Sequence, residues 1–181
     1  LVIESIRGMV PAVKPQFAFY EALGSHGFAA LEETCAMARD AGLLIVADAK
    51  RGDIGSSNVH YARALFDVWG FDATTVVCYT GGEALEPFLK YADRGVFVLC
   101  RSSNEGAGEF QDLRVSSGGD GRRLFEHVAE RASSWNRRGN VGLVVGATYP
   151  EELASVRSIC PDMPILMPGV GAQEGALRAS V

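Results

Sequence analysis

Charged residues follow directly on an apolar run at residues 43–47, and they are Asp48, Lys50, Arg51 and Asp53. Such a cluster is costly to bury unless its members are paired, so it marks either a functional site or a surface group of ion pairs. Side chains alternate along a strand, so Asp48 and Lys50 are expected on one face. A lysine held between two carboxylates keeps its proton. Such an ammonium could donate that proton to carbon without a metal ion.

A second lysine and a glycine-rich segment lie where they would support a site. Lys14 follows an apolar run at residues 9–13, so in a barrel with sequential strands it would neighbour the strand of Asp48. Residues 168–175, Pro-Gly-Val-Gly-Ala-Gln-Glu-Gly, follow the last apolar run. Glycines there let backbone N–H groups approach an anion such as phosphate. A solvated lysine and a tight structural turn are the alternatives.

Several common catalytic motifs have no counterpart in the sequence. His26, His60 and His127 are dispersed, so a histidine metal site is not expected. Neither a G-x-S-x-G elbow nor a G-x-x-x-x-G-K-[ST] loop occurs, which leaves serine hydrolases and P-loop enzymes without support. Glu174 occupies the place of the third glycine of G-x-G-x-x-G, so a dinucleotide-binding loop is disfavoured.

Short apolar runs rich in β-branched residues alternate with stretches of helical period, as in parallel strands covered by helices. The pattern predicts strands at residues 9–13, 43–49, 73–77, 96–100, 141–145 and 165–167. It predicts helices at residues 1–7, 28–41, 58–68, 82–91, 122–135 and 151–159. Residues 104–121 are polar and glycine-rich, so we expect a long loop there, either a binding element or a plain surface excursion.

The α/β pattern fits either a doubly wound sheet or part of an eight-stranded barrel, and periodicity does not decide between them. A closed barrel usually needs about 200–250 residues. The barrel interpretation therefore implies that the first and last strands are missing from this chain. In either case residues 1–181 are expected to form a single domain.

Composition excludes some classes of partner. The net charge is −5 with interspersed signs, which argues against a nucleic-acid surface or a membrane-attracted patch. No apolar run approaches the roughly 20 residues of a membrane span, and the N-terminus does not resemble a signal peptide. The four cysteines are far apart, which fits reduced thiols in the core of a cytoplasmic protein.

At this point the residues resemble a known family. Residues 48–57 are similar to the D-x-K-x-x-D-I signature of orotidine 5′-phosphate decarboxylases, and residues 14–21, 145–153 and 168–173 resemble motifs of the bacterial subgroup called type 2. The resemblance implies a TIM (β/α)8 barrel that lacks its first and last strands in this chain. It also implies decarboxylation of orotidine 5′-monophosphate to uridine 5′-monophosphate in pyrimidine biosynthesis, with no cofactor and no metal.

The resemblance assigns catalytic roles to four charged residues. They match the family's alternating tetrad, in which Lys50 is the proton donor to C6 of the pyrimidine: Lys14, Asp48, Lys50 and Asp53. In the family, the last aspartate and the isoleucine after it reach the neighbouring subunit's site. Asp53 and Ile54 are therefore expected to act across the interface of a homodimer.

The resemblance also assigns substrate-binding residues. Ser103 matches a serine that hydrogen-bonds the pyrimidine, and Gln173 matches a glutamine that links the phosphate to the base, close to Gly171 in the phosphate loop. Ser57 stands where the family usually has threonine. Family members also carry an aspartate on the first strand and an arginine after the eighth, and neither has a counterpart here.

Two other functions remain open from the sequence. The first is a magnesium-dependent sugar-phosphate decarboxylase or aldolase of the same superfamily, such as a 3-keto-gulonate 6-phosphate decarboxylase or a hexulose-phosphate synthase, because these share the barrel and a D-x-K-x-x-D strand. The second is a non-catalytic remnant that only binds nucleotide or dimerises. Neither alternative predicts a nucleic-acid or membrane partner.

Overall fold

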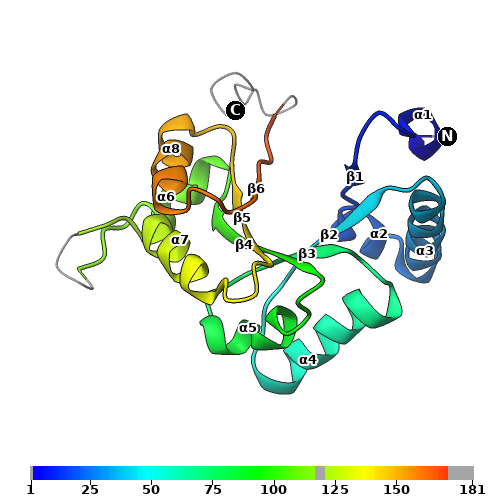
Figure 1. Ribbon diagram of the computed structural model, residues 1–181, viewed down its shortest axis with the longest axis horizontal. Helices are drawn as coiled ribbons and strands as arrows, with labels where there is room; N and C mark the ends of the chain where they lie inside the picture. Colours follow the sequence, from blue (N-terminus) through cyan, green and yellow to red (C-terminus); the bar gives the residue numbers. More distant parts are fainter. Residues whose placement is uncertain (1, 117–120, 171–181) are drawn as a thin grey trace.

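A single parallel sheet forms the centre of the molecule (Figure 1). The computed structural model describes residues 2–116 and 121–170. Neighbouring strands pair in parallel in the order β1-β2-β3-β4-β5-β6. Their bounds are Ala12–Val13 (β1), Leu44–Arg51 (β2), Ala73–Val76 (β3), Gly95–Arg101 (β4), Val141–Val145 (β5) and Ile165–Leu166 (β6).

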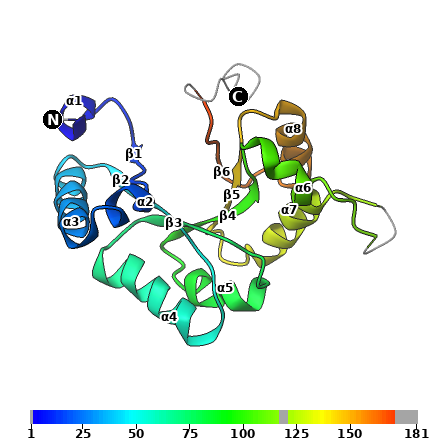
Figure 2. The same ribbon diagram turned by 180° about the vertical axis from the view of Figure 1, so that it is seen from behind.

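Helices connect the strands and lie around the outside of the curled sheet, as the views in Figures 1 and 2 agree. The α-helices are Val2–Ile6 (α1), Phe17–Glu21 (α2), Gly24–Asp40 (α3), Gly55–Arg63 (α4), Gly82–Leu89 (α5), Gly108–Gln111 (α6), Leu124–Trp135 (α7) and Pro150–Ile159 (α8). A π-helical turn, Ala64–Val68 (η1), continues α4, and a 3₁₀ turn, Glu105–Ala107 (η2), precedes α6. Within the described residues, no helix is long and apolar enough to cross a membrane.

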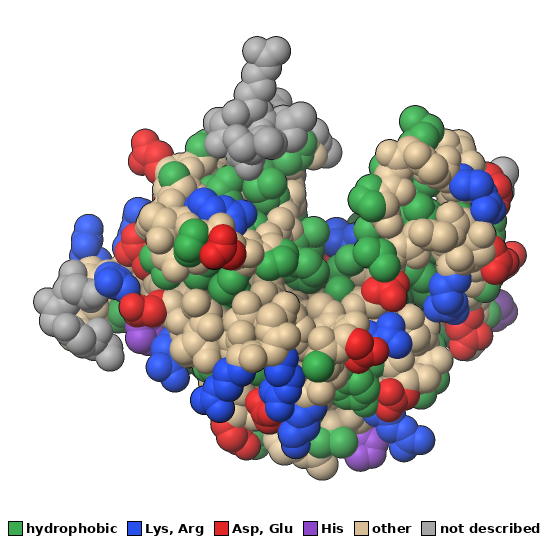
Figure 3. Space-filling view, viewed as in Figure 1, with side chains coloured by type: hydrophobic (Ala, Val, Ile, Leu, Met, Phe, Trp, Pro, Cys, Tyr) green, Lys and Arg blue, Asp and Glu red, His purple; other side chains and the backbone are tan. Residues whose placement is uncertain are grey.

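The strand order decides between the two predicted architectures. A doubly wound sheet reverses its strand order at a switch point, whereas a barrel adds each strand beside the previous one. The observed order is strictly sequential, so the fold is part of a (β/α) barrel. The edge strands β1 and β6 lie apart, and the space-filling view shows the molecule hollowed between its two halves (Figure 3).

The core lies between the sheet and the helices. In β2, Ile45, Ala47 and Ala49 are buried within the hydrophobic core, as the alternation of side chains predicts for one face of the strand. Asp48 projects from the other face of β2 into a cavity, described below. All four cysteines are free; Cys35, Cys100 and Cys160 are buried, whereas Cys78 is only partly buried.

Three local features differ from the sequence-based prediction. Helix α2 was not predicted, because it has only five residues and depends on the Gln16 side chain, which accepts a hydrogen bond from the N–H of Ala18. The predicted loop at 104–121 contains η2 and α6, so it is partly helical. Strand β1 is shorter than expected, because the chain turns at Gly8 and Met9.

Candidate active site

A cavity of about 580 Å³ opens at the carboxyl ends of the strands, where barrels assemble their sites. Its size is within the range of small-molecule pockets. One wall comes from β1, α2 and β2, and the other from the ends of β4, β5 and β6. The lining residues are Lys14, Gln16, Phe19, Asp48, Lys50, Leu99, Ser102, Ser103, Val144, Leu166, Pro168, Gly169 and Val170.

The centre of the first wall is the carboxylate of Asp48, which is 6% exposed. Its Oδ2 accepts hydrogen bonds from Lys14 Nζ at 2.5 Å and from Gln16 Nε2 at 3.0 Å. Its Oδ1 accepts from Lys50 Nζ at 2.5 Å and from Thr75 Oγ1 at 3.1 Å. Four donors from three strands or their ends therefore converge on one buried carboxylate.

The charges in this wall leave the cavity positive. Burial alone would raise the pKa of Asp48, but hydrogen bonds from Lys14 and Lys50, together with their charges, outweigh burial and lower that pKa. Asp48 is therefore an anion at neutral pH, and it offsets only one of its two ammonium partners. Since the lining of the cavity contains no other charged side chain among the described residues, the wall carries one net positive charge and suits an anionic ligand.

Lys50 reaches the cavity from a strained backbone. Its φ is 44°, and it is the only non-glycine residue with a positive φ in the described ranges. The pairing of β2 with β3 shifts register between Ala47 and Arg51, as at a β-bulge. The N–H of Lys50 is held by Thr75 Oγ1 at 3.0 Å. The Lys50 side chain keeps 42% of its surface exposed, so its ammonium remains accessible to a ligand.

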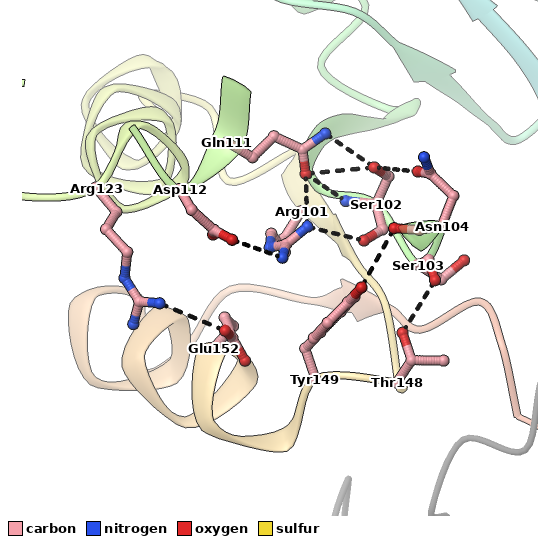
Figure 4. A network of polar contacts seen from close by, with 10 residues as sticks. All are labelled: Arg101, Ser102, Ser103, Asn104, Gln111, Asp112, Arg123, Thr148, Tyr149 and Glu152. Carbon is pink, nitrogen blue, oxygen red and sulfur yellow. Dashed lines mark hydrogen bonds and ion pairs between the residues drawn. The ribbon is translucent and has the colours of Figure 1, made fainter. Parts of the chain in front are cut away.

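The second wall presents Ser103 from the segment that follows β4. Thr148 Oγ1 donates to the carbonyl of Ser103 at 3.2 Å, and Tyr149 Oη donates to the carbonyl of Asn104 at 3.3 Å (Figure 4). A Cβ atom added at Gly146 would come within 2.8 Å of Ser103 Cα, so only glycine permits this approach. The Ser103 hydroxyl has no hydrogen-bond partner within the described part of the chain, and it is therefore free to bind a ligand.

Comparisons with known proteins agree with this geometry. The model of the orotidine 5'-phosphate decarboxylase / HUMPS family matches residues 2–179. The chain belongs to this family. An orotidine 5'-phosphate decarboxylase of Roseiflexus castenholzii is 52% identical over 181 residues, and one of Thermomicrobium roseum is 54% identical. These matches cover 99% of the chain but only 65% and 63% of the relatives, so the chain spans somewhat less than two thirds of their length.

Solved structures of the orotidine 5'-phosphate decarboxylase family also match the fold. The structure of Leishmania donovani UMP synthase superposes with a TM-score of 0.93 at 48% identity, and the match covers 98% of this chain and 39% of that one. The structure of L. donovani OMP decarboxylase gives a TM-score of 0.85 at 47% identity, over 93% of this chain and 64% of that one. The predicted family and the partial TIM barrel are thereby confirmed.

Not every residue that the family resemblance selected lies in the cavity. Lys14, Asp48, Lys50 and Ser103 line it together. Gly171 and Gln173 lie outside the described residues. The other selected residues, Asp53, Ile54 and Ser57, lie in or just before the first turn of α4 and do not line the cavity.

Asp53 is held by hydrogen bonds with Ile54 and Asn58. Its carboxylate accepts from the N–H of Ile54 at 2.8 Å, and both its backbone groups are held by the buried side chain of Asn58. Among the described residues Lys50 forms its ion pair with Asp48 alone. The expected arrangement, in which the Lys50 ammonium lies between the carboxylates of Asp48 and Asp53, is therefore not present among the described residues of one chain. Ile54 is 65% exposed.

Sequence reasoning missed Gln16 and Thr75, both of which bind Asp48 directly. A signal for Gln16 was available, because it lies two positions after Lys14 and so is expected on the same face of an extended segment. Nothing in the sequence distinguishes Thr75 from its neighbour Thr74, which is also buried and donates instead to the carbonyl of Ala47.

Lys50→Gly and Lys50→Ala should differ in stability because of the backbone. A left-handed conformation costs a residue with a side chain about 1–2 kcal/mol, and glycine in a strand normally costs about 0.5–1 kcal/mol. We therefore expect Lys50→Gly to be more stable than Lys50→Ala by roughly 0.5–1 kcal/mol in urea unfolding. Leu44, exposed in the same strand, is the control: Leu44→Gly should be less stable than Leu44→Ala. The same order at both positions would contradict the assignment of strain to Lys50.

Asp48 should give the fold a pH dependence of definite sign. Because its pKa is lowered from 3.8 by folding, its contribution to stability is present above that value and is lost as the pH falls through the folded pKa. The difference in free energy of unfolding between wild type and Asp48→Asn should be constant above about pH 5 and shrink below about pH 4. Asp93→Asn, at a carboxylate that is 77% exposed, should show little difference throughout. A difference that grows toward acid pH would overturn the assignment.

Proposed function

We propose that the protein containing this chain decarboxylates orotidine 5′-monophosphate to uridine 5′-monophosphate. The observation that carries the proposal is the Lys50 ammonium, which is 2.5 Å from the buried carboxylate of Asp48 and accessible from a cavity of nucleotide size. The names of the relatives support it, since proteins about 50% identical over nearly the whole chain are called orotidine 5'-phosphate decarboxylases. The family name also includes HUMPS, so family membership alone does not select this activity.

The proposed reaction follows from the charges in the cavity. The bond between C6 and the carboxylate breaks, carbon dioxide leaves, and the electron pair stays on C6. Lys50 stabilises the developing carbanion with its fixed positive charge and then transfers its proton to C6. Solvent returns a proton to the amine. The step needs no cofactor in this proposal, because one side chain supplies both the charge and the proton.

The remaining residues have proposed roles in binding. Lys14 and Gln16 hold Asp48 in place beside the departing carboxylate, and the free hydroxyl of Ser103 hydrogen-bonds the pyrimidine. Gly171 and Gln173 are proposed to bind the phosphate and to link it to the base. Ser57 remains a proposed contact to substrate. Residues 1–181 are proposed to belong to one barrel domain, and the proposed compartment is the cytoplasm.

The proposed protein is a homodimer in which Asp53 and Ile54 complete the neighbouring site. Three observations support this arrangement. Asp53 does not line the cavity of its own chain. Ile54 is an exposed apolar residue, and the buried Asn58 side chain holds the backbone of Asp53 in place.

Lys50→Ala should abolish turnover without abolishing nucleotide binding. We expect kcat to fall by at least about 10³-fold, because both the electrostatic and the proton-donating contributions are lost. The measurement is the loss of orotidine 5′-monophosphate absorbance, made on the protein expressed from its complete coding sequence, with calorimetry of uridine 5′-monophosphate binding. Lys90→Ala removes an exposed lysine at the end of α5 and serves as the control, with activity unchanged.

The same assays separate the alternatives. Wild-type turnover of a Lys50→Ala protein would sink the proposed mechanism. Binding without turnover in the wild type would identify a non-catalytic remnant. Activity toward a sugar phosphate that a chelator removes would instead identify a magnesium-dependent member of the superfamily.

Mixing two inactive variants tests the shared site. Lys50→Ala and Asp53→Ala subunits are each expected to be inactive alone, whereas a mixed dimer contains one site with both residues intact. After denaturation and joint refolding at equal amounts, half of the dimers are mixed, so activity should return to about a quarter of the wild-type value. Two Lys50→Ala samples carried through the same refolding provide the control. If the mixture stays inactive while refolded wild type recovers, Asp53 does not act across an interface.

A further inference from the structure

Arg101, the last residue of β4, is a buried cation outside the cavity that the proposed mechanism does not use. Its side chain is 2% exposed, although arginine is almost never fully buried unless it is paired. Its one ion pair among the described residues joins Nη2 to Asp112 Oδ2 at 3.2 Å. The guanidinium also lies 4.2 Å from the centre of the Tyr149 ring, in a cation–π contact.

The guanidinium joins the two ends of the segment that follows β4. At the near end, Nη1 donates to the carbonyl of Ser102 at 3.4 Å. At the far end, Nη1 donates to Gln111 Oε1 at 3.3 Å, and Asp112 completes the ion pair. Gln111 Oε1 also accepts from the N–H of Ser102 at 2.8 Å. Figure 4 shows Arg101 among these partners, so one side chain holds Ser102 against α6 and the residue after it.

A second set of contacts holds the same segment from the turn between β5 and α8. Tyr149, whose ring stacks on Arg101, donates through its hydroxyl to the carbonyl of Asn104. Thr148 donates to the carbonyl of Ser103. Ser103 is thus fixed on both sides, and of these residues only Ser102 and Ser103 line the cavity.

The pairing of Arg101 is incomplete, which bears on its role. Arg101 Nε and Asp112 Oδ1 are both buried and have no hydrogen-bond partner in the described residues. A buried polar atom without a partner costs free energy, and a buried ion pair is often no more stabilising than apolar residues of similar size. Stability alone therefore accounts poorly for an arginine here, whereas its several fixed donors suit the task of setting the geometry of a loop.

We propose that Arg101 is a positioning residue that sets the Ser103 hydroxyl in the cavity by tying Ser102 to Gln111 and Asp112. Arg101 itself does not touch the ligand. The inference rests on the proposed function, because Ser103 is taken as a contact to the pyrimidine. It goes further by naming the residues on which that contact depends.

A double-mutant cycle tests whether Arg101 acts through Ser103. In Arg101→Lys, one ammonium can keep the pair with Asp112 but cannot also serve Gln111, Ser102 and the Tyr149 ring. We expect kcat/KM for orotidine 5′-monophosphate to fall roughly 10- to 100-fold, as for a displaced substrate contact. Ser103→Ala should cause a similar loss, and the double variant should be no worse than Ser103→Ala alone. Losses that multiply in the double variant would overturn the proposal.

Two further variants keep the test decisive. Arg123→Lys removes a guanidinium that pairs with Glu152 and stacks on Phe125, so it controls for the exchange of arginine for lysine and should leave kcat/KM unchanged. Gln111→Leu removes the acceptor shared by Arg101 and Ser102. If Arg101→Lys does not fold, the cycle of Gln111→Leu with Ser103→Ala decides by the same criterion. Thermal unfolding, recorded for every variant, separates a loss of stability from a loss of kcat/KM.

The outcomes distinguish this inference from the proposed function. If the wild type turns over and the losses multiply, only the positioning role fails. If the wild type does not turn over, the proposed function fails, and the cycle is then measured as the affinity for uridine 5′-monophosphate by calorimetry. If the double variant then binds uridine 5′-monophosphate no more weakly than Ser103→Ala alone, the positioning role of Arg101 is still supported. Multiplying losses, or no binding by the wild type, would reject it.

Discussion

The geometry of the site depends on compensating one buried negative charge. The carboxylate of Asp48 is enclosed at the end of a central strand, and a buried charge is tolerated only when it is paired and fully hydrogen-bonded. Its partners come from different strands, with Lys14 beyond β1 and Thr75 in β3. The backbone N–H of Asp48 donates to the carbonyl of Pro15, which aligns the two segments. The position of each ammonium is therefore determined by the sheet.

The need to place the Lys50 ammonium beside Asp48 also explains why regular strand geometry ends at Lys50. Alternation carries the side chains of Asp48 and Lys50 to one face, but a regular strand would continue past the site without turning. The left-handed backbone at Lys50 and the register shift before Arg51 end the strand, and Gly52 then passes close to the carbonyl of Val77, where a Cβ would come within 2.6 Å. Thr75 Oγ1 accepts from the N–H of Lys50 and so holds this strained backbone conformation. The same hydroxyl donates to the carboxylate of Asp48 and so also stabilises the buried negative charge.

The features that could be predicted from the sequence are those formed by contiguous residues. The runs that became β2 and β5 are long and apolar, and the cluster around Asp48 is contiguous, so both were recognisable without coordinates. Thr75 was missed because its role depends on which residues of neighbouring strands lie side by side, and a single sequence does not display that register. Arg101 was missed because its partners, Gln111 and Asp112, approach it only through the fold of the segment after β4. The action of Asp53 across a dimer interface was predicted only through the family resemblance. Among the described residues of one chain, the Asp53 carboxylate accepts from the N–H of Ile54, and Lys50 pairs with Asp48 instead.

The two walls of the cavity would contribute differently to ligand binding. The wall of β1 and β2 carries the only charges among the described lining residues, whereas the wall of β4, β5 and β6 offers hydroxyls, apolar side chains and backbone. An anionic group is therefore attracted to the first wall, and a hydroxyl such as that of Ser103 can orient a ligand without competing for the charge. An exposed cation on the wall of β4, β5 and β6 would weaken the preference of an anionic group for the wall of β1 and β2. Arg101 lies behind the wall of β4, β5 and β6, where it is buried and paired with Asp112, so its charge does not reach the cavity. Arg101 can therefore position Ser103 without changing the electrostatic field at Lys50, which is determined by Asp48 and its partners.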